Sequence, residues 1–257
     1  MKIRDAIFQI KSLSFDETLE YLVTKAKKKG EKCFVVTINS EIIMLARRDP
    51  EYEEILKSAN LALVDGIGAV WAGKMFGKSF KGRVHGSDLV EKLSQAVTKQ
   101  PITVGFLGGK GNVAKLTAEC LVSKYPGLKV AFAASEWPGL EVDKEVSSIQ
   151  YPVSSKKILN TGYSILNTPI DILFVAFGAP KQEIWIYDNL PNIDVRVAIG
   201  VGGAFDFISG KVRRAPKFVR SLGLEWLFRL IIQPWRIKRQ TNLLKFVILV
   251  LIEKISG

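Results

Sequence analysis

One aspartate stands where the chain is expected to bind a ligand. The stretch from Leu61 to Gly68 has four apolar residues, then Asp65, then Gly66. A short apolar run bounded by glycine is typical of a buried strand in a parallel sheet, and ligands of such sheets bind beyond the carboxyl ends of strands. Gly66 lets the backbone turn tightly and approach a ligand. Asp65 is therefore either a catalytic carboxylate or the N-cap of a helix that starts near Ile67, since aspartate caps helices well.

Other polar side chains accompany this aspartate. Thr37 and Asn39 follow an apolar run, again at the exit of a predicted strand. Arg83 and His85 share a basic loop over residues 78–86. His85 is the only histidine, which excludes a mechanism based on a histidine pair, and a single histidine is more often structural than catalytic.

A glycine-rich turn could bind phosphate. Gly109-x-Gly111-x-x-Ala114 follows a predicted strand and opens a predicted helix, whose free backbone N–H groups suit a phosphate. The chain has no Asp-x-Asp and no cluster of histidines, cysteines or acids at metal-ligand spacing. Arginines and helix N-termini must then neutralise any diphosphate that binds.

Alternating apolar runs and helical patterns indicate the fold. The expected strands are 32–38, 61–64, 102–107, 128–134, 171–177 and 195–201. Ser14 and Glu17 have capping-box spacing at the start of one helix, and Ser87 could cap a helix over 88–99. Such alternation predicts an α/β fold with a Rossmann-like, mostly parallel sheet flanked by helices, over residues 1–210. The Ser/Thr/Asn-rich stretch 154–168 is expected to be a loop.

The last part of the chain has a different character. The formal charge is +12, and residues 211–257 alone hold 11 basic against two acidic residues. Apolar residues recur there at helical spacing, which predicts a basic amphipathic helical appendage. This appendage could lie on an anionic membrane surface, or it could dock on the protein's own core or on a second subunit.

The remaining features bear on the compartment. Cys33 and Cys120 lie far apart inside apolar patterns, so we expect two buried, reduced thiols in a cytoplasmic protein. The N-terminal residues contain no apolar signal core. The longest apolar run, 246–252, falls far short of the roughly 20 residues that span a bilayer.

Six motifs occur in a fixed order along nearly the whole chain. They are Thr37-x-Asn39-x-Glu41, Asp65-Gly66-x-Gly68, Arg83-x-x-Gly86-x-Asp88-Leu89, Gly178-Ala179-Pro180-Lys181-Gln182-Glu183-x-Trp185, Gly200-Val201-Gly202-Gly203-Ala204-Phe205-Asp206, and Arg214-Ala215-Pro216 followed by Gly223-Leu224-Glu225-Trp226 and Arg229-Leu230. Together they resemble the WecG/TagA/CpsF family of bacterial glycosyltransferases, which includes the N-acetylmannosaminyltransferases of wall teichoic acid synthesis.

The resemblance implies a specific reaction. The enzyme would transfer a sugar, with N-acetylmannosamine as the first candidate, from a UDP-sugar to undecaprenyl-diphospho-N-acetylglucosamine. The transfer would invert the anomeric configuration, need no metal or cofactor, and take place at the inner face of the cell membrane. Asp65 resembles the proposed general base of the family. The residues that resemble pocket residues are Thr37, Asn39, Arg83 and Gln182, and those that resemble diphosphate-binding groups of the appendage are Arg214, Arg220 and Arg229.

Several alternatives stay open. Another UDP-hexose could be the donor, because one or two pocket residues can select it. The glycine-rich turn also fits a nicotinamide-dependent oxidoreductase. A nucleic-acid binder is disfavoured, because the aliphatic content of residues 211–257 suits lipid better than a phosphate backbone. The sequence leaves open whether the chain forms a homo-oligomer.

Overall fold

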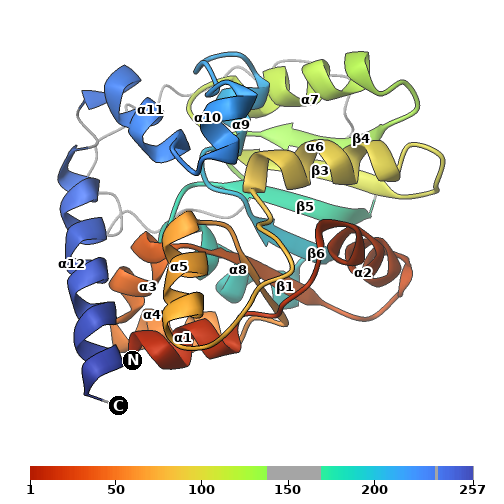
Figure 1. Ribbon diagram of the computed structural model, residues 1–257. Helices are drawn as coiled ribbons and strands as arrows, with labels where there is room; N and C mark the ends of the chain where they lie inside the picture. Colours follow the sequence, from red (N-terminus) through yellow and green to blue (C-terminus); the bar gives the residue numbers. More distant parts are fainter. Residues whose placement is uncertain (138–168, 235–236, 257) are drawn as a thin grey trace.

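A six-stranded parallel sheet forms the centre of the computed structural model, which describes residues 1–137, 169–234 and 237–256 (Figure 1). The strands are β1 (Cys33–Ile38), β2 (Leu61–Val64), β3 (Thr103–Gly108), β4 (Lys129–Ala134), β5 (Ile170–Ala176) and β6 (Val195–Gly200). They lie in the order β2-β1-β6-β5-β3-β4, and all neighbours pair in parallel. This arrangement confirms the predicted α/β fold.

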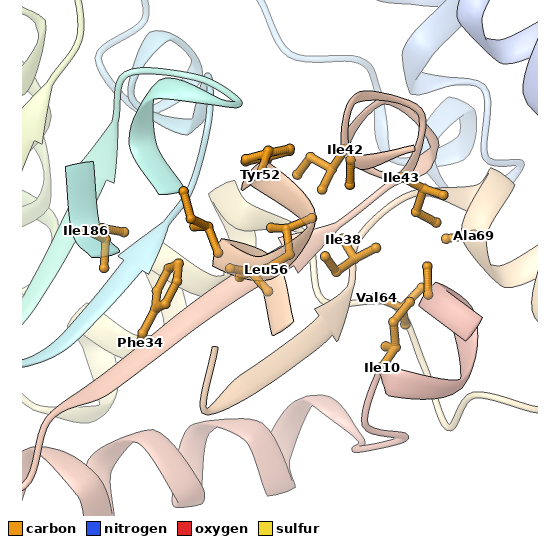
Figure 2. Close-up of a cluster of buried hydrophobic side chains, with 14 of the residues drawn as sticks. Ile10, Phe34, Ile38, Ile42, Ile43, Tyr52, Leu56, Val64, Ala69 and Ile186 are labelled. Atoms are coloured by element: carbon orange, nitrogen blue, oxygen red, sulfur yellow. The ribbon is translucent and has the colours of Figure 1, made fainter. Parts of the chain in front are cut away.

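Each strand contributes to two hydrophobic cores, because successive side chains point to opposite faces of a sheet. On β1, Phe34 and Val36 join one core, while Cys33 and Val35 join the other. The helices with buried side chains in the first core are α1 (Ile3–Gln9), α3 (Ser40–Ala46), α4 (Pro50–Lys57), α5 (Ile67–Met75), α8 (Lys181–Asn189) and α12 (Ile237–Ile255). Those of the second core are α2 (Phe15–Lys27), α6 (Gly86–Ala96), α7 (Val113–Lys124) and α9 (Ala204–Ile208). Figure 2 shows part of the first core.

The strand connections create a place for a ligand. Strands β1 and β2 continue into α3 and α5, which belong to the first core. Strand β6, the neighbour of β1, continues into α9 on the opposite face. Where neighbouring strands send their connections to opposite faces, a crevice opens beyond their carboxyl ends. Thr37, Asn39 and Asp65 therefore lie at the carboxyl ends of β1 and β2, where such folds bind ligands.

Local signals placed some elements correctly and others wrongly. The capping box of α2 is present, with Ser14 N donating to Glu17 Oε2 at 2.7 Å and Glu17 N donating to Ser14 Oγ at 3.2 Å. The prediction that Ser87 caps a helix over 88–99 is wrong. The helix there, α6, already begins at Gly86, with His85 in the N-cap position. The prediction for residues 154–168 lies outside the described residues.

The expectation of two buried thiols is half wrong. Cys33 is buried in β1, whereas Cys120 is exposed. Cys120 lies on α7, a helix that buries only its inward side against the sheet, so an apolar pattern around a cysteine does not decide on which side the thiol lies.

The described C-terminal part of the chain contains the α-helices α10 (Lys217–Ser221), α11 (Glu225–Ile232) and α12. Helix α12 lies along α1, α3 and α5 (Figure 1). Its Phe246 and Val250 are fully buried in the first core. Its Glu253 accepts hydrogen bonds from Ile3 N and Arg4 N, both at 3.1 Å, which satisfies the start of α1. One face of α12 is therefore docked on the core of the same chain.

The same three helices and the connection between α10 and α11 also expose many apolar side chains. They are Phe218, Leu222, Leu224, Trp226, Leu227, Ile231, Ile232, Ile237, Leu244, Ile248, Leu251, Ile252 and Ile255. Large exposed apolar surfaces usually mark a contact with a membrane or another protein. In the part of the chain that the structure describes, no helix combines the length and apolarity needed to cross a membrane. The division of the chain into a core over 1–210 and an appendage over 211–257 stays a prediction.

Candidate active site

Asp65 lies directly after β2 and pairs with His85. Asp65 Oδ1 is 2.8 Å from His85 Nδ1, and the two side chains are 25% and 22% exposed. Gly66 is the N-cap of α5, and no side chain caps that helix. The interpretation of Asp65 as a helix cap is therefore wrong. Asp65 N donates to Ile38 O at 2.9 Å, which holds this turn against the end of β1.

His85 reaches Asp65 because the loop before α6 returns to the sheet. Val84 N donates to Val64 O, the last residue of β2, at 2.8 Å. Gly86 packs so tightly on the end of β6 that a Cβ there would lie 2.9 Å from Val201 O. Burial lowers the pKa of His85, but the hydrogen bond and charge of Asp65 outweigh it, so the pKa is raised above its ordinary value.

Sequence reasoning missed this Asp65–His85 pair. The two residues are far apart in sequence, and a single histidine is more often structural than catalytic. The one signal in the sequence was the basic loop itself. Arg83, His85 and Ser87 alternate with other residues there, which indicates a polar segment and not a core element.

Thr37 and Asn39 make contacts inside the protein. The Thr37 hydroxyl donates to Gly200 O at 2.9 Å, and the residue is 4% exposed. Asn39 Oδ1 accepts from Ile42 N at 3.1 Å and so caps α3. A Cβ on Gly66 would lie 2.9 Å from Asn39 Cβ, so the turns after β1 and β2 pack together. Both residues shape the sheet edge, and their contact with a substrate stays a prediction.

Gln182 and Glu183 form a buried polar network with Tyr52. Gln182 is 2% exposed, and its Oε1 accepts from Gly178 N at 3.2 Å and from Gly202 N at 2.9 Å. Its Nε2 donates to Glu183 Oε1 at 2.6 Å, while the Tyr52 hydroxyl donates to Glu183 Oε2 at 3.0 Å. Burial raises the pKa of Glu183 to about 7. Gln182 thus ties together the turns that follow β5 and β6, and its role as a pocket residue stays a prediction.

The glycine-rich turn leads into α7 as predicted. Gly109 has a positive φ of 77° and donates its N–H to Ala176 O at 3.2 Å. The N-cap residue of α7, Asn112, makes no side-chain capping bond. Strands β1, β6 and β5 separate β3 from β2, so at about 4.8 Å per strand the turn lies roughly 19 Å from the exit of β2. A ligand that contacts both must lie along the edge of the sheet.

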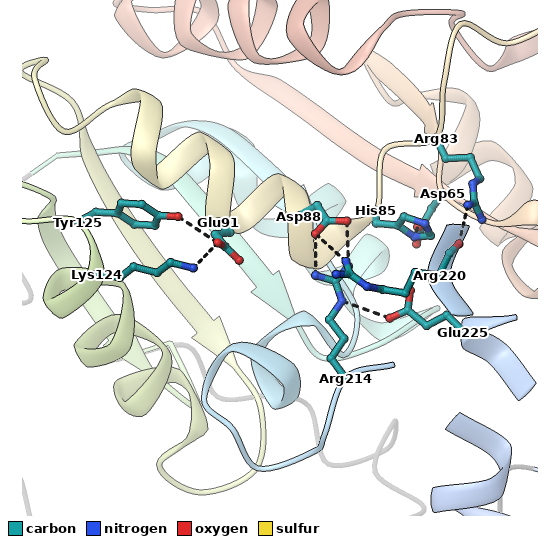
Figure 3. A network of polar contacts seen from close by, with 10 residues as sticks. All are labelled: Asp65, Arg83, His85, Asp88, Glu91, Lys124, Tyr125, Arg214, Arg220 and Glu225. Atoms are coloured by element: carbon teal, nitrogen blue, oxygen red, sulfur yellow. Dashed lines mark hydrogen bonds and ion pairs between the residues drawn. The ribbon is translucent and has the colours of Figure 1, made fainter. Parts of the chain in front are cut away.

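The segment before α6 also meets the C-terminal helices (Figure 3). Arg83 Nη2 donates to Arg220 O at 3.1 Å. Asp88, in the first turn of α6, accepts from Arg214 Nη1 at 2.6 Å and from Arg214 Nη2 at 2.8 Å. Arg220 Nη1 is 3.5 Å from Asp88 Oδ1. Residues separated by more than a hundred positions therefore meet beside Asp65.

Arg229 lies at the turn after β6. Its guanidinium carbon is 4.7 Å from the centre of the Phe207 ring, and its Nη2 is 3.8 Å from Asp206 Oδ2. All three arginines predicted to bind diphosphate therefore have an acidic neighbour on the body of the protein. Within residues 1–137, 169–234 and 237–256, no three histidine, cysteine, aspartate or glutamate side chains are grouped so that they could hold a metal ion.

Comparison with known proteins identifies the chain. A family model described as "Glycosyl transferase WecG/TagA/CpsF family" matches residues 5–257. The chain belongs to this family. It is a glycosyltransferase, as the six motifs predicted, and not a nicotinamide-dependent oxidoreductase.

Two relatives from Bacillus carry the same name, "N-acetylglucosaminyldiphosphoundecaprenol N-acetyl-beta-D-mannosaminyltransferase". The protein from Bacillus spizizenii is 34% identical over 233 residues, which cover 91% of this chain and 84% of the relative. The protein from Bacillus subtilis is 33% identical over 220 residues, which cover 86% of this chain and 79% of the relative.

Proposed function

We propose that this glycosyltransferase moves N-acetylmannosamine from a UDP-sugar to undecaprenyl-diphospho-N-acetylglucosamine in the synthesis of a cell-surface polymer. The observation that carries the proposal is the Asp65 carboxylate at the exit of β2, held by His85 and not used as a helix cap. The names of the two Bacillus relatives support this donor sugar and this acceptor. A different UDP-hexose donor is the alternative.

The transfer needs one base. An acceptor hydroxyl oxygen attacks the anomeric carbon, and its proton passes to Asp65. The bond between the anomeric carbon and the diphosphate oxygen breaks in the same step, and its electron pair leaves with UDP. A single displacement inverts the configuration, so an α-linked donor gives the β-linkage in the relatives' name. The His85 N–H bound to Asp65 Oδ1 keeps the carboxylate oriented and leaves the other oxygen for the acceptor.

The leaving UDP needs positive charge. Backbone N–H groups at the start of α7 and arginine side chains near Asp65 can supply it, without a metal ion. The roughly 19 Å between the glycine-rich turn and the exit of β2 suits an extended nucleotide-sugar along the sheet edge. In this pose the nucleotide would lie towards Gly109 and the sugar towards Asp65.

The acceptor carries a long lipid, so the enzyme must work at a membrane. The exposed apolar side chains of α10, α11 and α12 lie on helices that belong to the most basic part of the chain. Such a surface suits peripheral binding to an anionic bilayer at its cytoplasmic face. Liposome flotation of the full chain, with and without anionic lipid, tests this part of the proposal. Equal recovery with neutral and anionic vesicles would contradict the electrostatic contribution.

A substrate panel with one variant tests the reaction. The wild-type enzyme is incubated with a short-chain lipid-diphospho-N-acetylglucosamine and a series of UDP-sugars, and products are scored by mass spectrometry. Asp65→Asn should retain fold and UDP binding but lose roughly 10²–10⁴-fold in turnover, the usual contribution of a general base. Asp16→Asn, an exposed acid on α2, is the matched control. Near-normal turnover of Asp65→Asn would remove Asp65 from this role.

A further inference from the structure

The C-terminal helices are fastened to the body by an ion-pair cluster around Asp88. Arg214 uses all three of its nitrogens: both Nη atoms donate to Asp88, and Nε donates to Glu225 Oε1 at 3.3 Å. Glu225 is the first residue of α11, so one guanidinium joins α6 to α11. Such a bidentate arginine–carboxylate contact is both strong and directional. Burial raises the pKa of Asp88, but Arg214 outweighs it, so the pKa is lowered and Asp88 stays ionised.

Arg229 makes a second fastening at the turn after β6. It lies over Phe207 and beside Asp206. A Cβ at position 203 would lie 2.5 Å from Arg229 Nη2, so a side chain there would push the guanidinium out of this position. Gly223, between α10 and α11, likewise packs on Ile67 at the start of α5. These contacts hold the C-terminal helices at the edge of the sheet that carries Asp65.

Arg220 differs from Arg214 in its hydrogen bonding. Its backbone oxygen accepts from Arg83, which holds it beside the Asp65–His85 pair (Figure 3). Its side chain approaches Asp88 with one nitrogen, Nη1, at the longer distance of 3.5 Å. Its Nε is buried without a hydrogen-bond partner in the described part of the chain. A buried N–H donor without a partner is costly and is satisfied when a ligand accepts from it.

We propose that Asp88 is a positioning residue of the glycosyltransferase, which clamps Arg214 so that α10 and α11 stay docked and Arg220 is left to meet the leaving diphosphate. In this assignment, which rests on the proposed function for the identity of the ligand, Arg214 and Arg229 fasten the C-terminal helices and Arg220 binds. A diphosphate could recruit Arg214 only by displacing Asp88 from two short hydrogen bonds, whereas the side chain of Arg220 is joined to Asp88 by a single, longer ion pair.

The first experiment measures docking without any substrate. Hydrogen exchange of the full-length enzyme is followed in peptides that cover residues 214–232. Asp88→Asn keeps the shape of the side chain but removes its charge, and it should raise exchange in these peptides about tenfold or more, with the sheet unchanged. Arg214→Gln should do the same. Glu91→Gln is the matched control, because Glu91 lies one turn later on α6 and pairs with Lys124 and Tyr125, away from the C-terminal helices (Figure 3).

The second experiment separates clamping from binding. UDP affinity is measured by calorimetry for Arg214→Gln and Arg220→Gln. Arg220→Gln should keep the exchange protection of residues 214–232 and bind UDP about tenfold more weakly. Arg214→Lys should partly restore the protection that Arg214→Gln loses. Unchanged exchange in Asp88→Asn would overturn the clamp. Weak UDP binding by Arg214→Gln with full protection would make Arg214 a ligand and overturn the assignment.

The two experiments also keep this proposal distinct from the proposed function. Hydrogen exchange requires no sugar donor, so it decides the role of Asp88 even if the wild-type enzyme transfers none of the sugars in the panel. A wild-type enzyme that transfers no sugar while Asp88→Asn loosens residues 214–232 would refute the substrate assignment and leave the clamp standing.

Discussion

Glu183→Gln should change how the stability of this enzyme depends on pH. Glu183 is fully buried, and burial raises its pKa from 4.5 to about 7. The unfolded chain loses this proton near pH 4.5, whereas the folded protein keeps it until about pH 7. The free energy of unfolding therefore falls as pH rises through this window, and levels off above it. A pKa difference of about 2.5 corresponds to roughly 3 kcal/mol, at about 1.4 kcal/mol per pKa unit.

The assay is urea unfolding of both proteins at steps from pH 4.5 to pH 8.5. Glutamine cannot ionise, so the variant lacks this loss, and the difference between the two free energies should change by roughly 3 kcal/mol across the window. Altered hydrogen bonds to Tyr52 and Gln182 change the difference between the two free energies of unfolding by the same amount at every pH. The test therefore depends on how this difference changes with pH. Glu20→Gln, an exposed acid on α2, should give a flat difference. A flat difference for Glu183→Gln would refute the reasoning.

Three further predictions concern single side chains. His85→Leu removes the N–H donor to Asp65, and kcat should fall roughly tenfold to a hundredfold in steady-state kinetics. His85→Asn keeps a donor near the Nδ1 position and should recover part of the lost kcat. Phe246→Ala should cost about 3–5 kcal/mol in urea unfolding, because this α12 side chain is fully buried in the first core; a loss below 1 kcal/mol would contradict the docking of α12. Ser14→Ala should cost about 1 kcal/mol through loss of the capping box, and an unchanged thermal midpoint would contradict it.

Most of the fold could be read from local patterns. Apolar runs such as β5 read as buried strands because each is short and bounded by turn residues, and their alternation with helices left a parallel sheet as the simple solution. The exact start of α6 could not be read, because Ser87 is a good cap by type but the chain turns earlier. Gly86 has to pack against Val201, and only the folded sheet brings these two residues together.

The candidate site was readable as a set of residue types but not as a set of contacts. The pattern placed Asp65 at a strand exit, and the structure places it there. Thr37 and Gln182 resemble pocket residues of the family, yet both are buried and bonded to the backbone at the end of β6 or in the turn after it. A motif records that a side chain matters at a position, but the direction of that side chain depends on which strands become neighbours.

The sequence by itself determined the sheet, the family and the position of Asp65, because strand burial, turn chemistry and motif order are properties of short segments. Only the tertiary structure decided the partners: His85 for Asp65, and Asp88 for Arg214, which are 126 residues apart. Hydrogen bonds and ion pairs act over a few ångströms and depend on direction. Their partners are therefore fixed only when the loop before α6 returns to the sheet and the C-terminal helices dock beside it.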